Sequence, residues 1–150
     1  AKSATVSTWA FFLVKSNSSK AYYRSFNSVF GKVGRQASEE ITIKLIQTKC
    51  LPVILFGLDA CPVNSTDNHS FDFLLTRSLM KLFNAGSNSI ITECRKIFNV
   101  KLLSECIIDR KKSFLYRYSN TENVICKLFY FETVKELLHL WTIVEISHSS

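Results

Sequence analysis

The chain has 150 residues, the size of one domain, and its 47% hydrophobic and 13% aromatic content excludes a disordered composition. Only 4 Gly and 2 Pro are present, too few for the turns of a β-sandwich or barrel, so helix is favoured. The net charge of +7, with a sequence pI near 9.3, favours association with a polyanion, although a basic solvated surface explains it about as well.

The cysteine and histidine content indicates neither a metal site nor a cofactor. The five cysteines form no close Cys-x-x-Cys pair, and the three histidines lie far apart in the sequence. We interpret the cysteines as reduced and buried, which favours an intracellular protein in the nucleus or cytoplasm. The apolar stretch from Trp9 to Val14 is too short for a signal-peptide core or a membrane span, so we expect no membrane partner.

The first clear element is a helix from Lys20 to about Val33; residues 1–19 match no pattern. Its predicted inward face consists of Tyr23, Phe26, Phe30 and Val33. Its opposite face carries Lys20, Arg24, Lys32 and Arg35. Gly34 is the expected C-cap.

A second helix is expected to begin after Ser38, whose side chain would cap it, with two glutamates in the first turn. We expect its inward residues to be Ile41, Leu45, Ile46 and Cys50. Pro52 then interrupts an apolar run that extends to Leu58. Either the helix continues through a kink at the proline, or the β-branched residues form a short strand near Val53–Phe56.

The third helix has the cleanest periodicity and is expected to start at a Ser65 or Thr66 cap. One face consists of Phe71, Leu74, Leu75, Leu79, Leu82 and Phe83, and the opposite face carries Arg77 and Lys81. Residues 84–87 end it.

Three further helical segments follow: one near residues 90–98, one starting at Ser104 and ending at residues 119–121, and one amphipathic helix within residues 124–146. The predicted fold is mainly α, an irregular helical bundle of about six helices. We divide it into an unassigned segment 1–19, a helical domain 20–118, and a C-terminal amphipathic helix and tail 119–150.

No arrangement of residues indicates catalysis. The sequence has no adjacent aspartates for a two-metal site, no glycine-rich phosphate loop ahead of a helix, and no framed nucleophile. Asp59 is a single carboxylate that we interpret as a surface or packing contact. We therefore predict no catalytic and no metal-binding residue.

Two basic clusters are the candidate nucleic-acid contacts. They comprise Lys20, Arg24, Lys32 and Arg35, and then Arg110, Lys111 and Lys112 together with Arg117. Such residues neutralise phosphates and bind any sequence in a salt-dependent manner. Tyr22 and Tyr23 could stack on bases, although we expect Tyr23 to pack inward. For each cluster a merely solvated face is an equal alternative.

The stretch from Lys20 to Phe98 resembles the thumb and C-terminal extension of reverse transcriptases from LINE-type (non-LTR) retrotransposons. The resemblance is carried by Tyr23 to Arg35, by Lys49 to Pro62, by Phe71 to Leu74 and by Met80 to Asn84. The block Leu55-Phe56-Gly57-Leu58-Asp59 matches a recurring mark of that region. The likeness continues more loosely to Arg117, where Leu103-Ser104 replaces a common Pro-Ser pair.

The resemblance implies a thumb-like helical subdomain that grips template–primer nucleic acid, an RNA–DNA or DNA duplex, and it favours the helix at Pro52. The family's metal-binding aspartates lie in the palm, which this chain lacks, so we expect no enzyme activity from the chain alone. Its partners would be nucleic acid and the palm and fingers of a polymerase. The alternatives are a helical protein-interaction module that uses the Phe71 to Phe83 face, or a relic of a retroelement open reading frame.

Overall fold

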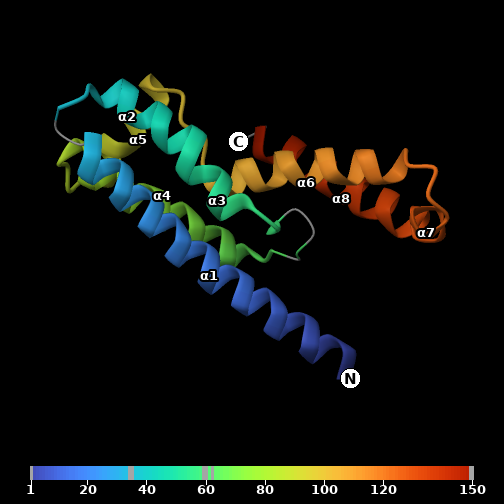
Figure 1. The fold of residues 1–150 in the computed structure, drawn as a ribbon. Helices are drawn as coiled ribbons and strands as arrows, with labels where there is room; N and C mark the ends of the chain where they lie inside the picture. Colours follow the sequence, from blue (N-terminus) through green and yellow to red (C-terminus); the bar gives the residue numbers. More distant parts are fainter. Residues whose placement is uncertain (1, 34–35, 59–60, 62, 149–150) are drawn as a thin grey trace. The chain divides into compact units, whose positions relative to one another are not determined.

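The computed structural model describes residues 2–33, 36–58, 61 and 63–148, with side chains from Lys15 to Thr142 within those ranges (Figure 1). Every regular element in this part of the chain is a helix, which confirms the mainly α class. The elements are α1 Lys2–Val33, α2 Glu39–Leu45, the π-helical segment η1 Ile46–Cys50, α3 Leu51–Leu55, α4 Ser65–Phe83, α5 Asn88–Ile97, α6 Leu103–Ser119, α7 Val124–Leu128 and α8 Tyr130–His148.

The chain forms two compact units, Ala1–Cys106 and Ile107–Ser150, and the division falls within α6. In the first unit α1 packs against α2, η1, α3 and α4, and α4 also packs against α5. Helix α1 therefore contacts most of the other elements of this unit, and it includes the segment 2–19 that showed no sequence pattern.

The core of the first unit is centred on two aromatic residues of α1. Tyr22 and Phe26 are buried and their rings stack, with centroids 6.3 Å apart. They pack in a core with apolar residues of η1, α3 and α4, namely Ile46, Cys50, Ile54, Phe71, Leu75 and Leu79. The prediction that Tyr23 packs inward is wrong, because Tyr23 is 41% exposed. The buried stripe starts one residue earlier, which is about 100° round the helix.

The run around Pro52 is helical, so the alternative of a short strand near Val53–Phe56 is wrong. Segment η1 carries the chain into the proline as a wide π-turn, in which the Leu51 N–H donates to the Ile46 carbonyl, five residues back. Pro52 lies in the first turn of α3, where its missing N–H costs little. Ile41 is 55% exposed, contrary to expectation, and Thr42 and Ile43 are buried instead.

The described residues of the mark Leu55-Phe56-Gly57-Leu58-Asp59 form a turn at the end of α3. Phe56 has φ −62° and ψ 122°, and Gly57 has φ +79°. These angles match the central residues of a type II turn, whose second central position requires positive φ. The turn directs Leu58 into the core, where it is 1% exposed, and leaves Phe56 79% exposed. Asp59 lies outside the described residues, as does Gly34.

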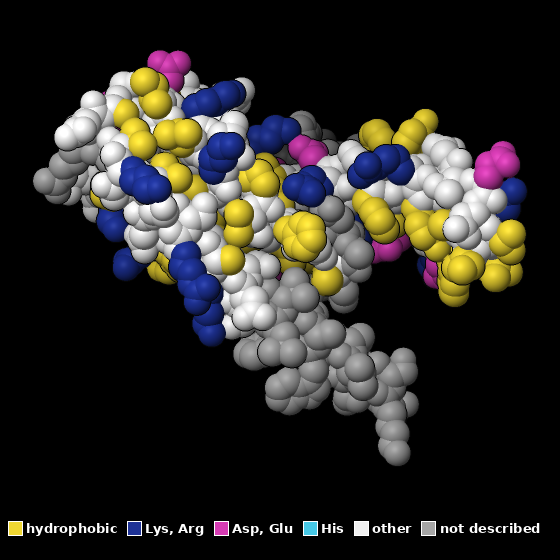
Figure 2. All heavy atoms as spheres, in the orientation of Figure 1, with side chains coloured by type: hydrophobic (Ala, Val, Ile, Leu, Met, Phe, Trp, Pro, Cys, Tyr) yellow, Lys and Arg dark blue, Asp and Glu magenta, His cyan; other side chains and the backbone are white. Residues whose placement is uncertain are grey.

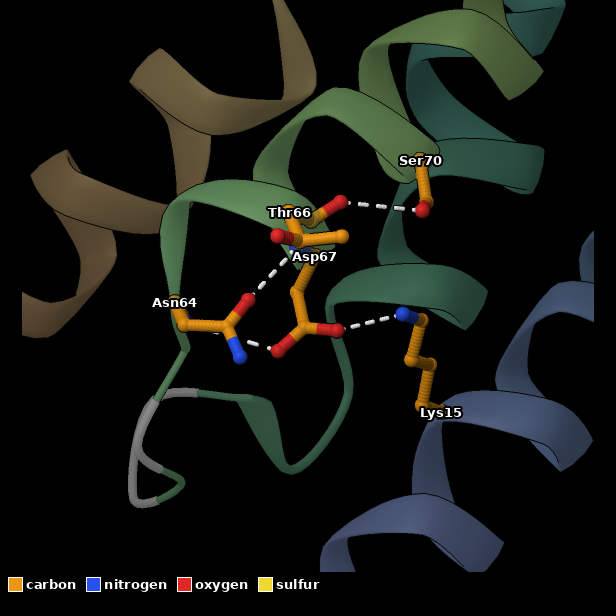
Figure 3. A network of polar contacts seen from close by, with 5 residues as sticks. All are labelled: Lys15, Asn64, Thr66, Asp67 and Ser70. Atoms are coloured by element: carbon orange, nitrogen blue, oxygen red, sulfur yellow. Dashed lines mark hydrogen bonds and ion pairs between the residues drawn. The ribbon is translucent and has the colours of Figure 1, made fainter.

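Helix caps follow the expected chemistry, with one change of residue. Ser38 caps α2 as predicted, because its hydroxyl accepts from the Ile41 N–H. Helix α4 is capped by Asn64, not by Ser65 or Thr66. Asn64 and Asp67 form a reciprocal capping box, in which the Asp67 N–H donates to Asn64 Oδ1 at 2.8 Å (Figure 3).

Side-chain carboxylates tie α4 to its neighbours. The Asp67 carboxylate also pairs with Lys15 of α1, as Figure 3 shows. Five residues further along α4, Asp72 accepts hydrogen bonds from the Ser104 N–H at 2.9 Å and the Ser104 hydroxyl at 2.7 Å. The start of α6 is therefore bound to α4, and the helix begins at Leu103, one residue before the expected position.

In the second unit, the predicted single helix within residues 124–146 is wrong. Phe129 separates α7 from α8, and Asn123 caps α7 by accepting from the Ile125 N–H at 2.9 Å. The predicted end of α6 at residues 119–121 is confirmed. The remainder of α6 contacts α8 through polar side chains that are described below.

Glycine substitutions test the turn after α3. Replacing Gly57 by Ala places a side chain at φ +79°, and we expect a loss of about 1 kcal/mol in the free energy of unfolding. Gly31→Ala lies in exposed helix with nothing within 4 Å of the added Cβ, so we expect a gain of about 0.5–1 kcal/mol. Urea unfolding monitored by circular dichroism measures both, and equal effects would contradict the turn assignment.

Tyr22→Phe tests the packing of the core. The Tyr22 hydroxyl is buried without a hydrogen-bond partner among the described residues. Burial raises the pKa of Tyr22, and the nearby Ser78 side chain opposes this shift. Removing an unsatisfied buried hydroxyl recovers a desolvation cost, so we expect stability to stay equal or rise by about 1 kcal/mol. A clear loss in thermal or urea unfolding would show that a Tyr22–Ser78 hydrogen bond forms in solution.

Candidate nucleic-acid interface

Helix α1 carries the first basic cluster and has no acidic residue anywhere in its 32 residues. Lys20, Arg24 and Lys32 are exposed. None of the three pairs with a carboxylate of the described residues. The fourth predicted contact, Arg35, lies outside the described residues. The exposed face of α1 therefore presents positive charge that no described neighbour neutralises.

The three cations are arranged along the helix rather than around one point. At a rise of about 1.5 Å per residue, Lys20 and Lys32 are about 18 Å apart along the axis. Lys20 and Arg24 are one turn apart on nearly the same side, whereas Lys32 is displaced by about 120° from Lys20. The helix thus offers a short basic edge, with a third cation to one side of it.

A groove of about 620 Å³ lies between α1 and the C-terminal half of α4. Its walls include Tyr23 and Asn27 from α1 and Arg77, Ser78 and Lys81 from α4, and Gly86 also lines it. No carboxylate lines it. Figure 2 shows one face of the molecule, on which lysine and arginine side chains are spread over the first unit among exposed hydrophobic ones.

The two groove cations are held against aromatic rings. The Lys81 ammonium lies 5.7 Å from the centroid of the Phe26 ring and 5.1 Å from that of Phe30. It also donates to Asn27 Oδ1 at 3.2 Å. The Arg77 guanidinium lies 5.7 Å from the ring centroid of Phe73. These contacts restrain both side chains without cancelling their charge.

Sequence reasoning did not count Arg77 and Lys81 as candidate contacts. They were correctly placed opposite the apolar face of their helix, and both are exposed. What the sequence could not show is that α1 lies beside α4 and brings Tyr23 and Asn27 to them. The sequence signal that could have identified them was the pair of cations four residues apart on an exposed helix face.

The two tyrosines exchange the roles expected of them. Tyr22 is buried and cannot reach a ligand, whereas Tyr23 lines the groove. The Tyr23 ring packs edge-on against Tyr22, with centroids 5.9 Å apart at 69°. The exposed aromatic ring on the basic helix is therefore Tyr23.

The second basic cluster is largely engaged inside the second unit. Lys111 forms an ion pair with Glu136, and the Lys112 ammonium lies 4.6 Å from the centroid of the Trp141 ring. Both contacts join α6 to α8. Arg117 Nε donates to the Ser113 carbonyl of its own helix at 3.3 Å, and Arg110 is exposed. Lys111 and Lys112 thus already serve helix packing.

The cysteines are only partly as expected. Cys50 is fully buried, and this burial raises the pKa of its thiol, with a smaller opposing effect from the Ser25 hydroxyl that donates to Cys50 Sγ at 3.4 Å. The other four cysteines are half-buried. Among the described residues, no group of three or more His, Cys, Asp or Glu side chains is placed to hold a metal ion. None of the described helices has the length and apolar character needed to cross a membrane.

Comparison with protein-family models, with curated proteins and with solved structures finds no match to this chain.

Proposed function

We propose that this chain is a non-catalytic segment of the reverse-transcriptase thumb type that binds template–primer nucleic acid through the exposed basic face of α1. The observation that carries the proposal is the absence of any carboxylate along α1, beside three exposed cations with no described ion-pair partner. The resemblance of the motifs from Tyr23 to Asn84 supports the choice of family, and the positive charge of α1 supports nucleic acid as the ligand.

The binding mode follows from simple electrostatics. Lysine and arginine side chains that approach phosphates release the counterions condensed on a duplex, which gives affinity without sequence preference. A polymerase needs this property in order to hold an arbitrary template–primer. In this proposal a palm elsewhere supplies the metal-binding aspartates and the nucleotidyl transfer. The chain acts inside the cell, in the nucleus or cytoplasm, and does not incorporate nucleotides by itself.

The proposal is tested by fluorescence anisotropy of an RNA–DNA duplex titrated with the chain over a salt series. In the test variant, Lys20, Arg24 and Lys32 are replaced together by alanine. We expect weaker binding, and a salt slope that is less steep by up to about 2.7, because each lost phosphate contact removes about 0.9.

The matched control removes three other exposed lysines, Lys44, Lys49 and Lys96, and so changes the net charge equally. We expect the control to bind almost like the original chain. If both triple variants weakened binding equally, binding would depend only on net charge, and α1 would not be a specific binding face. Incorporation of nucleotides by the purified chain would contradict its non-catalytic character.

Protein interaction is a second candidate function, but not through the face first expected. Phe71, Leu74, Leu75 and Leu79 are buried in the first unit, so that face is not available to a partner. The exposed apolar side chains gather instead at the α7 end of the second unit, where Figure 2 shows them clustered. They are Val124, Ile125, Leu128, Phe129, Tyr130 and Phe131, each between 53% and 78% exposed.

Sedimentation tests this second candidate. Six such side chains together offer an area of the order of the roughly 800 Å² per partner that a standard interface buries, and a second copy of the chain is the simplest occupant. We expect concentration-dependent dimerisation that persists at high salt and is lost in Leu128→Glu/Phe131→Glu. A monomer at all concentrations would exclude self-association. If the chain also failed to bind nucleic acid, the remaining interpretation would be that it is a relic of a retroelement open reading frame.

A further inference from the structure

The groove between α1 and α4 is a site of its own, beside the basic face of α1. We propose that it holds one unpaired nucleotide of a single-stranded nucleic acid, with the phosphate at Arg77 and Lys81 and the base against the ring of Tyr23. The inference rests on the proposed function, because it assigns the groove to the same ligand class. It adds a single-strand subsite to a surface proposed for duplex.

The charge of the groove selects an anion. Arg77 and Lys81 approach it from one side of α4, four residues apart, and none of its lining residues is acidic. Lys81 uses one of its three donors on Asn27 and keeps the others for a ligand. Neither cation has an ion-pair partner among the residues that the structure describes.

The remaining walls select a ring rather than a simple anion. Tyr23 is 41% exposed, and its edge-on contact with the fully buried Tyr22 restrains the ring. A restrained, half-exposed aromatic ring is the platform on which unpaired bases stack, whatever their identity. The exposed Asn27 amide adds a polar group to the lining, whereas the Ser78 hydroxyl is buried and donates to the Leu74 carbonyl. A volume of about 620 Å³ is within the usual range for small-ligand sites.

An unpaired nucleotide fits this site better than a base pair does. In a duplex each base is stacked between its neighbours, so its face is not available to a side chain. A single strand presents both a base face and a phosphate at each nucleotide. Arg24 follows Tyr23 directly and Lys20 lies one turn earlier, so a strand that leaves the groove along α1 meets the basic face.

The experiment compares two probes at one salt concentration: a fluorescein-labelled single-stranded dT10 and the RNA–DNA duplex. We expect Tyr23→Leu to weaken dT10 binding about five-fold or more, and Tyr23→Phe to change it less than two-fold, because only the first removes the ring. Neither change should alter duplex binding by more than about two-fold. Thermal unfolding by circular dichroism confirms that both variants are folded.

The charge contribution is tested separately. Arg77→Gln/Lys81→Gln should weaken dT10 binding, with a salt slope less steep by about 0.7, since the two cations share one phosphate and each phosphate contact to a single strand contributes about 0.7. The control Lys44→Gln/Lys49→Gln makes the same change of charge on exposed residues outside the groove and should bind dT10 as the original chain does.

The outcomes separate this inference from the proposed function. Unchanged dT10 binding by Tyr23→Leu overturns the groove site, even if the Lys20, Arg24 and Lys32 variant still loses duplex. Loss of dT10 binding in the groove variants supports the groove site, even if the α1 variant keeps its duplex affinity and so overturns the proposed function. Equal weakening of both probes by Tyr23→Leu overturns a single-strand subsite. Failure of the folded chain to bind either probe at low salt overturns both.

Discussion

The first unit depends on the burial of one stripe of α1. Tyr22 and Phe26 pack in a core shared with η1, α3 and α4, and this contact fixes the rotation of the longest helix about its axis. Once these rings are inside, helical geometry turns Lys20, Tyr23 and Arg24 outward. The basic face and the groove beside it are therefore consequences of core packing.

The π-helical segment η1 allows the chain around Pro52 to pack against α1. Pro52 follows the helical residues of α2 and η1 and cannot donate a hydrogen bond, so a regular α-helix would leave a carbonyl without its partner there. The wide turn of η1 absorbs the irregularity and keeps Ile46, Cys50 and Ile54 buried. Apolar burial along this curved element outweighs the strand preference of the β-branched residues that follow the proline.

Two acidic residues of α4 hold the fold together rather than neutralise the basic face of α1. Asp67 pairs with Lys15 and completes the cap of α4, and Asp72 binds the start of α6. Neither carboxylate faces the exposed cations of α1. In the second unit the relation is different, since Lys111 and Lys112 contact Glu136 and Trp141. A run of basic residues can thus serve packing in one place and remain open to solvent in another.

The sequence by itself determined the helical class, the Ser38 cap and the apolar face of α4, because periodicity and capping chemistry are local properties. Only the tertiary structure decided the features that depend on contacts with other helices. Tyr22 and Tyr23 are adjacent and equally apolar, so only the position of the partner helices selects which ring is buried. Asn64, Ser65 and Thr66 are all good caps, and the backbone at Asn64 makes the choice. The groove joins Tyr23 to Arg77 and Lys81 across more than fifty residues, and no local pattern can encode such a distance.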